Sequence, residues 1–161
     1  MEYLILTESS PTGKNMKIAE DIKKIIDATS EISDEVTVLS SFKMSKIIHG
    51  SIELYDHIIM VVPEWNGSFP YTLKHLIDNS DWPSHFENKK VTLIGTCGSM
   101  ESDFEGIKHL RHILDYIGAI VNSESVYIKG LSKDLSKEHY RSETDQLVNV
   151  IIDICSTSIN N

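Results

Sequence analysis

The stretch YLILTESSPTGKNMKIAEDIKKII, Tyr3–Ile26, carries the pattern from which the fold can be predicted. It opens with YLILT, a short apolar run typical of a β-strand, and continues through a polar loop that contains a single glycine. The apolar residues after Asn15 then fall on one stripe of a helix: Ile18, Ala19, Ile22, Ile25 and Ile26. The stretch therefore predicts a strand, a loop and an amphipathic helix in succession.

The same alternation of strand and helix patterns continues along the chain. Short β-branched runs bounded by polar or turn residues predict strands at Tyr3–Thr7, Val36–Leu39, Ile58–Val62, Val91–Ile94 and Ser125–Ile128. Several of these runs are apolar on both faces, as strands in the middle of a parallel sheet are. We therefore expect helices to cover both sides of the sheet.

Two helical patterns follow in the second half of the chain. The first is expected to end at Gly118, a suitable C-cap, and its apolar stripe consists of Ile107, Leu110, Leu114 and Ile117. The second predicts a C-terminal helix whose stripe consists of Leu147, Val150, Ile151 and Ile154. Val148 and Ile152 widen this stripe, which we interpret as a deeper core contact in preference to an oligomer contact.

Strands that alternate with helices predict right-handed βαβ crossovers and a three-layer α/β sandwich. Five strands in 161 residues suit a five-stranded parallel sheet of order 2-1-3-4-5, the flavodoxin-like arrangement. No internal repeat or linker interrupts the pattern, so residues 1–161 are expected to form a single flavodoxin-like domain.

The composition favours a soluble cytoplasmic protein. Hydrophobic residues make up 40% of the chain, and 15 Lys and Arg against 24 Asp and Glu give a net charge of −9. This charge repels nucleic acid and anionic membranes, and no apolar run approaches the ~20 residues of a membrane helix. Cys97 and Cys155 provide neither a disulfide framework nor a paired metal-ligand motif. No nucleic-acid or membrane partner is therefore expected.

In a sheet of this order, ligands bind beyond the carboxyl ends of the strands. The loops after the first, third and fourth strands are polar and contain glycine: Glu8–Asn15 (ESSPTGKN), Pro63–Pro70 (PEWNGSFP) and Gly95–Ser102 (GTCGSMES). We expect these three loops to meet and to form the binding site.

The first loop has the groups that a phosphate dianion needs. Ser9, Ser10 and Thr12 offer hydroxyls, Gly13 allows a tight turn before the first amides of a helix, and Lys14 adds a positive charge. The alternative is an ordinary connection with Thr12 as the N-cap of the helix. The loop matches neither a Walker motif nor a dinucleotide fingerprint.

The second loop offers a flat surface for a planar heteroaromatic ligand. Pro63 fixes the backbone, Asn66-Gly67 is a strong turn signal, and Trp65 supplies an aromatic face. The alternative is a turn whose tryptophan only packs against the protein.

The segment PEWNGSFPYTLKHLID, Pro63–Asp78, resembles the NADPH-dependent FMN reductase family, in which the usual pattern is P-E-Y-N-x-S-x-P followed by a helix with L-K-x-x-I-D. The region Lys89–Val121 is similar to the strand, flavin-contacting loop and L-R-x-x-L helix of that family. The likeness covers roughly residues 1–130 and implies non-covalent FMN in a homodimer or tetramer. It also implies NADPH or NADH as the electron donor and a small electron acceptor such as a quinone, azo compound, metal oxyanion or free flavin.

The resemblance implies that FMN itself carries the chemistry, with no catalytic side chain. The cofactor-binding residues it implies lie in the three loops: Ser9, Ser10, Thr12, Gly13, Lys14, Asn15, Pro63, Glu64, Trp65, Asn66, Gly67, Thr96, Cys97, Gly98 and Ser99. The first loop departs from the family pattern G-S-x-R-x-x-S-x-N, because in Thr7–Asn15 only Asn15 agrees. Glu8 would repel a phosphate if it pointed at one. The run Ser10–Asn15 instead resembles the phosphate loop of true flavodoxins.

Three other functions remain open at this point. The chain could be a flavodoxin-type electron carrier, or a family member with weakened flavin binding. It could also be a cysteine enzyme, since Cys97 follows a strand where a helix N-terminus could lower its pKa. No metal site is expected, because His109 and His112 lack a further ligand at a defined spacing.

Overall fold

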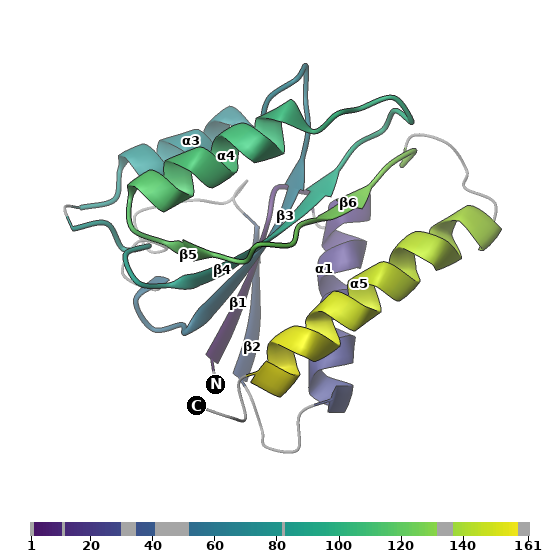
Figure 1. Ribbon diagram of the computed structural model, residues 1–161, viewed down its shortest axis with the longest axis horizontal. Coiled ribbons are helices and arrows are strands. Elements are labelled where there is room, and N and C mark those ends of the chain that lie inside the picture. Colours follow the sequence, from purple (N-terminus) through teal and green to yellow (C-terminus); the bar gives the residue numbers. More distant parts are fainter. Residues whose placement is uncertain are drawn as a thin grey trace.

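A parallel β-sheet forms the middle layer of the computed structural model (Figure 1). The structure describes residues 2–10, 12–29, 35–40, 52–81, 83–131 and 137–157, with side chains for 145–156 in the last range; Pro11 of the first loop lies outside them. The strands are β1 (Glu2–Thr7), β2 (Glu35–Ser40), β3 (His57–Pro63), β4 (Lys90–Thr96), β5 (Ile120–Val121) and β6 (Val126–Ile128). Their order is β2-β1-β3-β4-β5, with β6 also paired to β4, which confirms the flavodoxin-like order.

The edge strand is made of two pieces where the sequence predicts one. β5 pairs with β4 at Lys90 and Val91, whereas β6 pairs with it from Ile94 to Thr96. Between the pieces, the Asn122 side chain accepts a hydrogen bond from the Glu124 amide at 3.3 Å, which turns the chain. This local side-chain contact interrupts the ladder without changing the strand order.

Helices cover both faces of the sheet, as expected for a three-layer sandwich (Figure 1). α1 (Lys14–Thr29) and α5 (Lys137–Thr157) lie on one face, while α3 (Tyr71–Asp78) and α4 (Glu105–Tyr116) lie on the other. α4 ends before Gly118, whose φ of 88° is the left-handed conformation expected after a helix. In the described part of the chain, no helix is both long and apolar enough to cross a bilayer.

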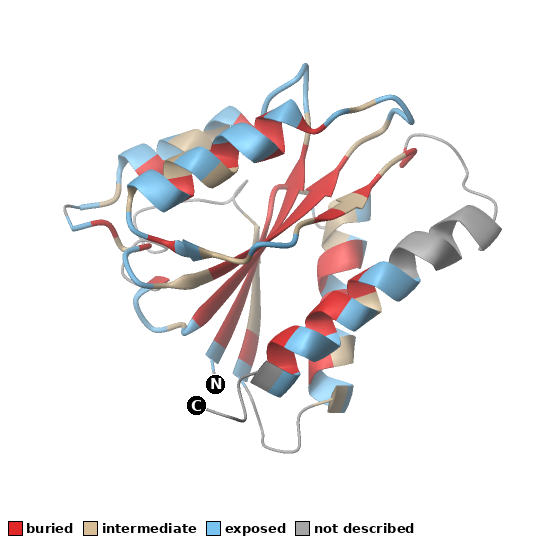
Figure 2. Cartoon of the chain, viewed as in Figure 1, coloured by how far each residue is buried: buried red, intermediate tan, exposed pale blue. Residues whose placement is uncertain are grey.

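Two hydrophobic cores flank the sheet, and alternate residues of each central strand enter opposite cores. Leu4 and Leu6 of β1 pack toward α3 and α4, whereas Tyr3 and Ile5 pack toward α1 and α5. Figure 2 shows the central strands buried along most of their length. Burying one such side chain contributes about 1.5–3 kcal/mol, so the sheet is a rigid base for the loops at its carboxyl edge.

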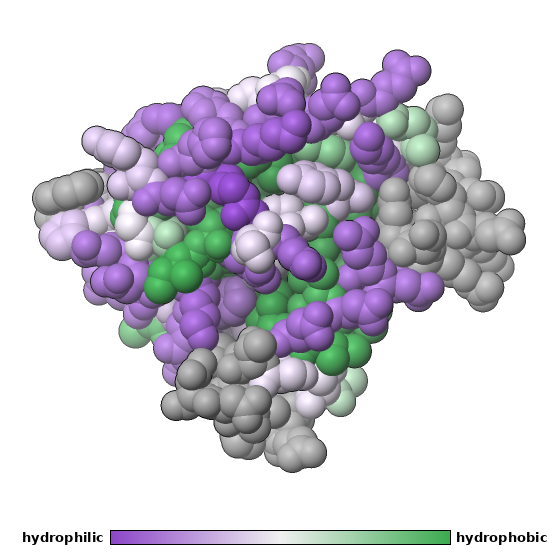
Figure 3. Space-filling model, in the orientation of Figure 1, coloured by the Kyte–Doolittle hydropathy of each residue, from purple (hydrophilic) through white to green (hydrophobic). Residues whose placement is uncertain are grey.

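The wider apolar side of α5 does not lie in the core. The predicted stripe is buried, but Val148 is only half-buried and Ile152 is 37% exposed, contrary to the deeper core contact that we expected. The stripe is nevertheless wide enough to pack α5 against α1 and the sheet. Figure 3 shows a mostly hydrophilic face with more than one apolar area; one of them lies over β5, where Ile120 is 57% exposed.

Candidate functional site

The three polar loops meet at the carboxyl edge of the sheet, where they enclose a cavity of about 350 Å³. The carboxyl ends of β1, β3 and β4 lie side by side, since β3 pairs with both β1 and β4. Residues from all three loops and one later residue line the cavity: Glu8, Ser9, Ser10, Lys14, Asn15, Pro63, Glu64, Trp65, Thr96, Cys97, Gly98 and Leu131.

The first loop turns tightly into α1. The Gly13 amide donates to the Ser10 main-chain oxygen at 2.9 Å, and the Ser9 hydroxyl donates to the same oxygen at 3.0 Å. A Cβ at Gly13 would collide with Ser9 Oγ, so a side chain at this position would require the Ser9 hydroxyl to rotate away. The first amides of α1, which have no partner within a helix, therefore begin directly beside the cavity.

Asn15 joins the first loop to the end of β4. Its Nδ2 donates to the Glu8 main-chain oxygen at 3.3 Å, and its Oδ1 accepts from the Thr96 hydroxyl at 2.9 Å. Lys14 links a second pair of segments, because its ammonium group donates to the main-chain oxygen of Leu131. These two side chains fix the first loop against the opposite wall of the cavity.

The second loop contains a two-residue turn, Asn66-Gly67, directly after Trp65. Backbone hydrogen bonds of 2.8 and 3.0 Å pair Trp65 with Ser68. Asn66 and Gly67 have φ angles of 52° and 76°, the left-handed values that this kind of tight turn requires. Trp65 is 48% exposed and lines the cavity, so part of the indole is open to a ligand.

Glu64 fixes the second loop to the third loop and to α4. Its carboxylate accepts one hydrogen bond from the Ser102 hydroxyl at 2.5 Å and another from the Gly106 amide at 2.9 Å. Its own amide donates to the Thr96 main-chain oxygen at 2.7 Å. The carboxylate thus satisfies an amide at the N-terminus of α4, where negative charge is favourable.

Replacing Glu64 with alanine is expected to lower the free energy of unfolding by about 2 kcal/mol, because two hydrogen bonds to a charged group are lost. Urea denaturation of the two proteins measures this difference. Glu101→Ala is the control, since Glu101 is exposed in the neighbouring loop and its loss should cost under about 0.5 kcal/mol. Equal losses in the two variants would contradict the role of Glu64.

The third loop is tied to the segment that follows β6. The Cys97 amide donates to Ile128, and the Leu131 amide donates back to the Cys97 oxygen, at 2.9 and 3.0 Å. Cys97 Sγ accepts from the Ser99 amide at 3.4 Å. Among the described residues, no histidine, the usual base beside a cysteine nucleophile, lines this cavity.

Most of the predicted site residues line the cavity, but Thr12, Gly13, Asn66, Gly67 and Ser99 do not. Gly13 and the Asn66-Gly67 pair shape the turns that carry the lining residues. Glu8 and Leu131 also line the cavity, although they are not among the predicted site residues. For Glu8, its position directly after a buried strand was the available signal, whereas nothing in the sequence marks Leu131.

Glu8 is buried in the wall of the cavity. It is 4% exposed, and neither carboxyl oxygen has a hydrogen-bond partner among the described residues. Burial raises the pKa of the Glu8 carboxyl, and the neighbouring Thr72 hydroxyl on α3 offsets part of this shift. The site therefore contains a buried polar group that a ligand could satisfy.

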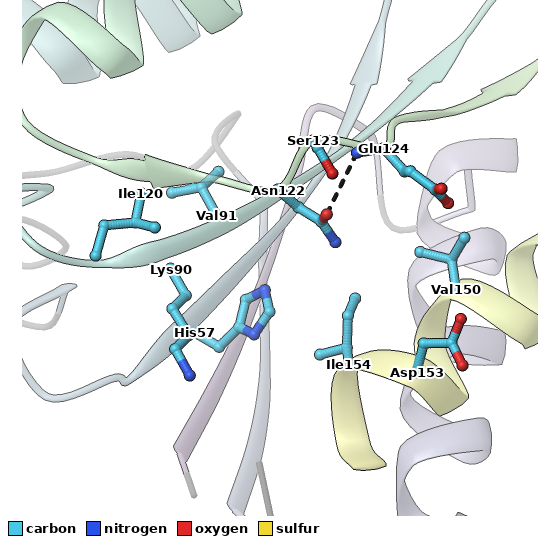
Figure 4. Close-up of a pocket in the computed structure, with 10 residues that line it drawn as sticks. All are labelled: His57, Lys90, Val91, Ile120, Asn122, Ser123, Glu124, Val150, Asp153 and Ile154. Atoms are coloured by element: carbon cyan, nitrogen blue, oxygen red, sulfur yellow. Dashed lines mark hydrogen bonds between the residues drawn. The ribbon is translucent and has the colours of Figure 1, made fainter. Parts of the chain in front are cut away.

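A second cavity, of about 360 Å³, lies at the amino ends of β3 and β4, away from the three loops. Figure 4 shows His57 and Lys90 on the sheet side, and Val150, Asp153 and Ile154 on α5 at the other side of the cavity. Burial lowers the pKa of His57 to about 4, and the charge of Lys90 adds to the effect. None of the cofactor-binding residues predicted from the sequence lines this second cavity.

The pair His109 and His112 lies in a groove between α3 and α4. Within the described part of the chain, no cluster of three or more His, Cys, Asp or Glu side chains could hold a metal ion. The groove therefore gives no reason to place a metal there.

Comparisons with known proteins agree with this geometry. A family model described as NADPH-dependent FMN reductase matches residues 14–132. An FMN-dependent NADH:quinone oxidoreductase of Ruegeria pomeroyi is 36% identical over 56 residues, covering 27% of this chain and only 28% of that protein. The match to this relative is therefore local.

Two solved structures are similar over nearly the whole chain. An oxidoreductase of Corynebacterium diphtheriae has a TM-score of 0.79 at 15% identity, covering 100% of this chain and 98% of its own. An NADH:FMN oxidoreductase in its apo form has a TM-score of 0.76 at 16% identity, covering 98% and 89%. At such identities, these similarities show a shared fold.

Proposed function

Because this chain belongs to the NADPH-dependent FMN reductase family, we propose that it is an FMN-dependent NAD(P)H oxidoreductase. The observation that carries the proposal is the cavity at the carboxyl edge of the sheet, where the N-terminus of α1 and the exposed Trp65 face one ligand space. A helix N-terminus suits the phosphate of FMN, and an aromatic side chain suits its flat ring. The residues present therefore fit the cofactor.

The phosphate is proposed to bind at the first loop. Ser9 and Ser10 line the cavity and offer hydroxyls, and the first amides of α1 point from its N-terminus. Lys14 adds positive charge to the same wall. Thr12, Gly13 and Asn15 complete this loop, where Gly13 permits the turn and Asn15 holds it against β4.

The isoalloxazine is proposed to bind between the second and third loops. Trp65 offers its face, and Pro63 and Glu64 form the neighbouring wall. Thr96, Cys97 and Gly98 form the opposite wall, where hydrogen bonds to Ile128 and Leu131 hold the backbone. Asn66, Gly67 and Ser99 are proposed to contribute by shaping these loops.

When bound, FMN supplies hydride transfer from NAD(P)H and onward reduction of an acceptor. The protein binds and orients the cofactor and leaves the site open to a second reactant. Glu64 does not need to move a proton in this reaction, because its carboxylate is already engaged with Ser102 and Gly106. The proposal therefore assigns no catalytic side chain.

The acceptor is proposed to be a small molecule such as a quinone, an azo compound, a metal oxyanion or free flavin. We further propose one domain for residues 1–161, assembly as a homodimer or tetramer, and a cytoplasmic location. One sheet carries both cores, which supports a single domain. Cys97 and Cys155 are not joined in a disulfide, as is usual in a reducing compartment.

A flavodoxin-type electron carrier is the second candidate. The net charge of −9 favours it, because an acidic surface suits docking to basic protein partners. Such a carrier would bind FMN in the same cavity but would not react directly with NAD(P)H.

Mixing FMN-loaded protein with NADPH or NADH under anaerobic conditions is expected to bleach the flavin absorbance in a stopped-flow experiment. The fluorescence of FMN should also be quenched on binding. At an FMN concentration a hundredfold above its Kd, the free energy of unfolding should rise by about 2.7 kcal/mol. Binding without bleaching by either nucleotide would favour the electron carrier. The absence of both quenching and stabilisation would contradict flavin binding altogether.

A further inference from the structure

Glu8 and Glu64 lie in the wall of the same cavity, but their carboxyl groups have opposite surroundings. Both oxygens of Glu64 accept hydrogen bonds, whereas neither oxygen of Glu8 has a partner among the described residues. Glu8 is also 4% exposed, so water does not replace the missing partners. Beyond the nearby Thr72 hydroxyl nothing compensates a buried carboxylate at this position, and its ionisation is costly, which favours the protonated form of Glu8.

The charged groups around the cavity do not compensate an ionised Glu8. Lys14 of α1 directs its ammonium group to Leu131, and Glu64 of the second loop adds negative charge. Cys97 of the third loop faces the same space, and Thr72 of α3 offers only a hydroxyl. No ion pair of Glu8 is found in the described part of the chain, and burial raises the pKa of this carboxyl.

The charge of Glu8 matters because the proposed ligand carries a phosphate. Ser9 and Ser10, which are proposed to bind that phosphate, follow Glu8 directly and line the same cavity. An ionised Glu8, buried in the wall of the cavity, would repel the phosphate. A protonated Glu8 can instead donate a hydrogen bond from its O–H group to an oxygen atom of the ligand.

We propose that Glu8 binds FMN as a neutral hydrogen-bond donor, so that FMN binding is coupled to the uptake of one proton at pH values where the free protein holds Glu8 ionised. This inference rests on the proposed function. It also explains how the first loop can tolerate an acidic residue beside a phosphate site.

The coupling has a defined direction. Glu8 holds its proton more tightly in the complex than in the free protein, so FMN affinity falls as the pH rises between the two pKa values of this carboxyl. Within that interval, one coupled proton changes the Kd by up to about tenfold per pH unit. The Glu8→Gln variant keeps the shape and a donor group but cannot ionise, so its Kd lacks this dependence.

The test measures the Kd for FMN by fluorescence quenching from pH 5.5 to 8.5 in wild type, Glu8→Gln and Glu2→Gln. Glu2 is exposed at the other end of β1 and serves as the matched control. The titration of the FMN phosphate cancels in the ratio of wild-type to variant Kd. We expect this ratio to rise with pH for Glu8→Gln and to stay constant for Glu2→Gln.

A second measurement follows the protons directly: mixing unbuffered wild-type protein with FMN should consume more protons than mixing the Glu8→Gln variant with FMN does. The infrared spectrum of the wild type should show the band of a protonated carboxyl group that is absent from the spectrum of Glu8→Gln. This band should disappear at a higher pH in the FMN complex than in the free protein. A pH-independent Kd ratio, or loss of FMN binding in a folded Glu8→Gln, would overturn the inference while leaving the proposed function intact. If neither protein binds FMN at any pH, the proposed function itself fails.

Discussion

Gly106→Ala is expected to lower the free energy of unfolding by about 3 kcal/mol, near the upper end of the range for overpacked sites. A Cβ at this position would lie 2.5 and 2.6 Å from the carbonyl carbon and Cα of Ser68, and 2.7 Å from the Phe69 nitrogen. These are backbone atoms of the second loop, which the Trp65–Ser68 hydrogen bonds hold in place. The clash should outweigh the helix propensity of alanine, a gain of about 1 kcal/mol over glycine.

The same substitution should weaken FMN binding, because it separates α4 from the loop that carries Trp65 and disturbs the hydrogen bond from Gly106 to Glu64. Gly67→Ala is the matched control in the adjoining turn. Nothing lies within 4 Å of a Cβ at Gly67, so that variant bears only the cost of its positive φ, about 1 kcal/mol. Urea denaturation and FMN titration of both variants check the prediction, and equal stability losses would contradict it.

The sheet could be predicted from the sequence because each strand signal is local. Runs such as YLILT and IIMVV are apolar on both faces, and the polar loops that follow mark their ends. The structure extends the first four predicted strands by only a few residues, as in β3, His57–Pro63, and begins the last one a residue later, at Val126. The break between β5 and β6 could not be predicted in this way, because it depends on how the Asn122 side chain meets the Glu124 amide.

The meeting of the three loops could also be predicted, since strand order alone places the carboxyl ends of β1, β3 and β4 together. The roles of single side chains could not. Glu64 meets Ser102 and Gly106 from 38 and 42 residues away, and those contacts depend on how α4 docks. Burial of Glu8 likewise depends on packing near α3, so the sequence showed an acidic residue but not its surroundings.

His57 is expected to make the protein sensitive to acid, with a loss of about 3 kcal/mol of stability between neutral pH and pH 4. Burial first, and the charge of Lys90 second, lower the pKa of His57 from its usual 6.5 to about 4. In the unfolded chain, His57 therefore binds a proton below about pH 6.5, whereas in the folded protein it binds one only near pH 4. By linkage, this contribution is fully present above pH 6.5 and is lost as the pH falls toward 4.

Urea denaturation at several pH values between 7 and 4 measures this effect, and the difference between wild type and His57→Gln isolates it from other titrating groups. His57 is 5% exposed and its Nε2 lies 2.9 Å from the Thr92 hydroxyl, a contact that the glutamine amide can retain. His57→Gln should therefore lose less stability in acid than wild type does. His112→Gln, at an exposed position on α4, should follow the wild-type curve. Parallel curves for wild type and His57→Gln would mean that His57 does not resist protonation in the folded protein.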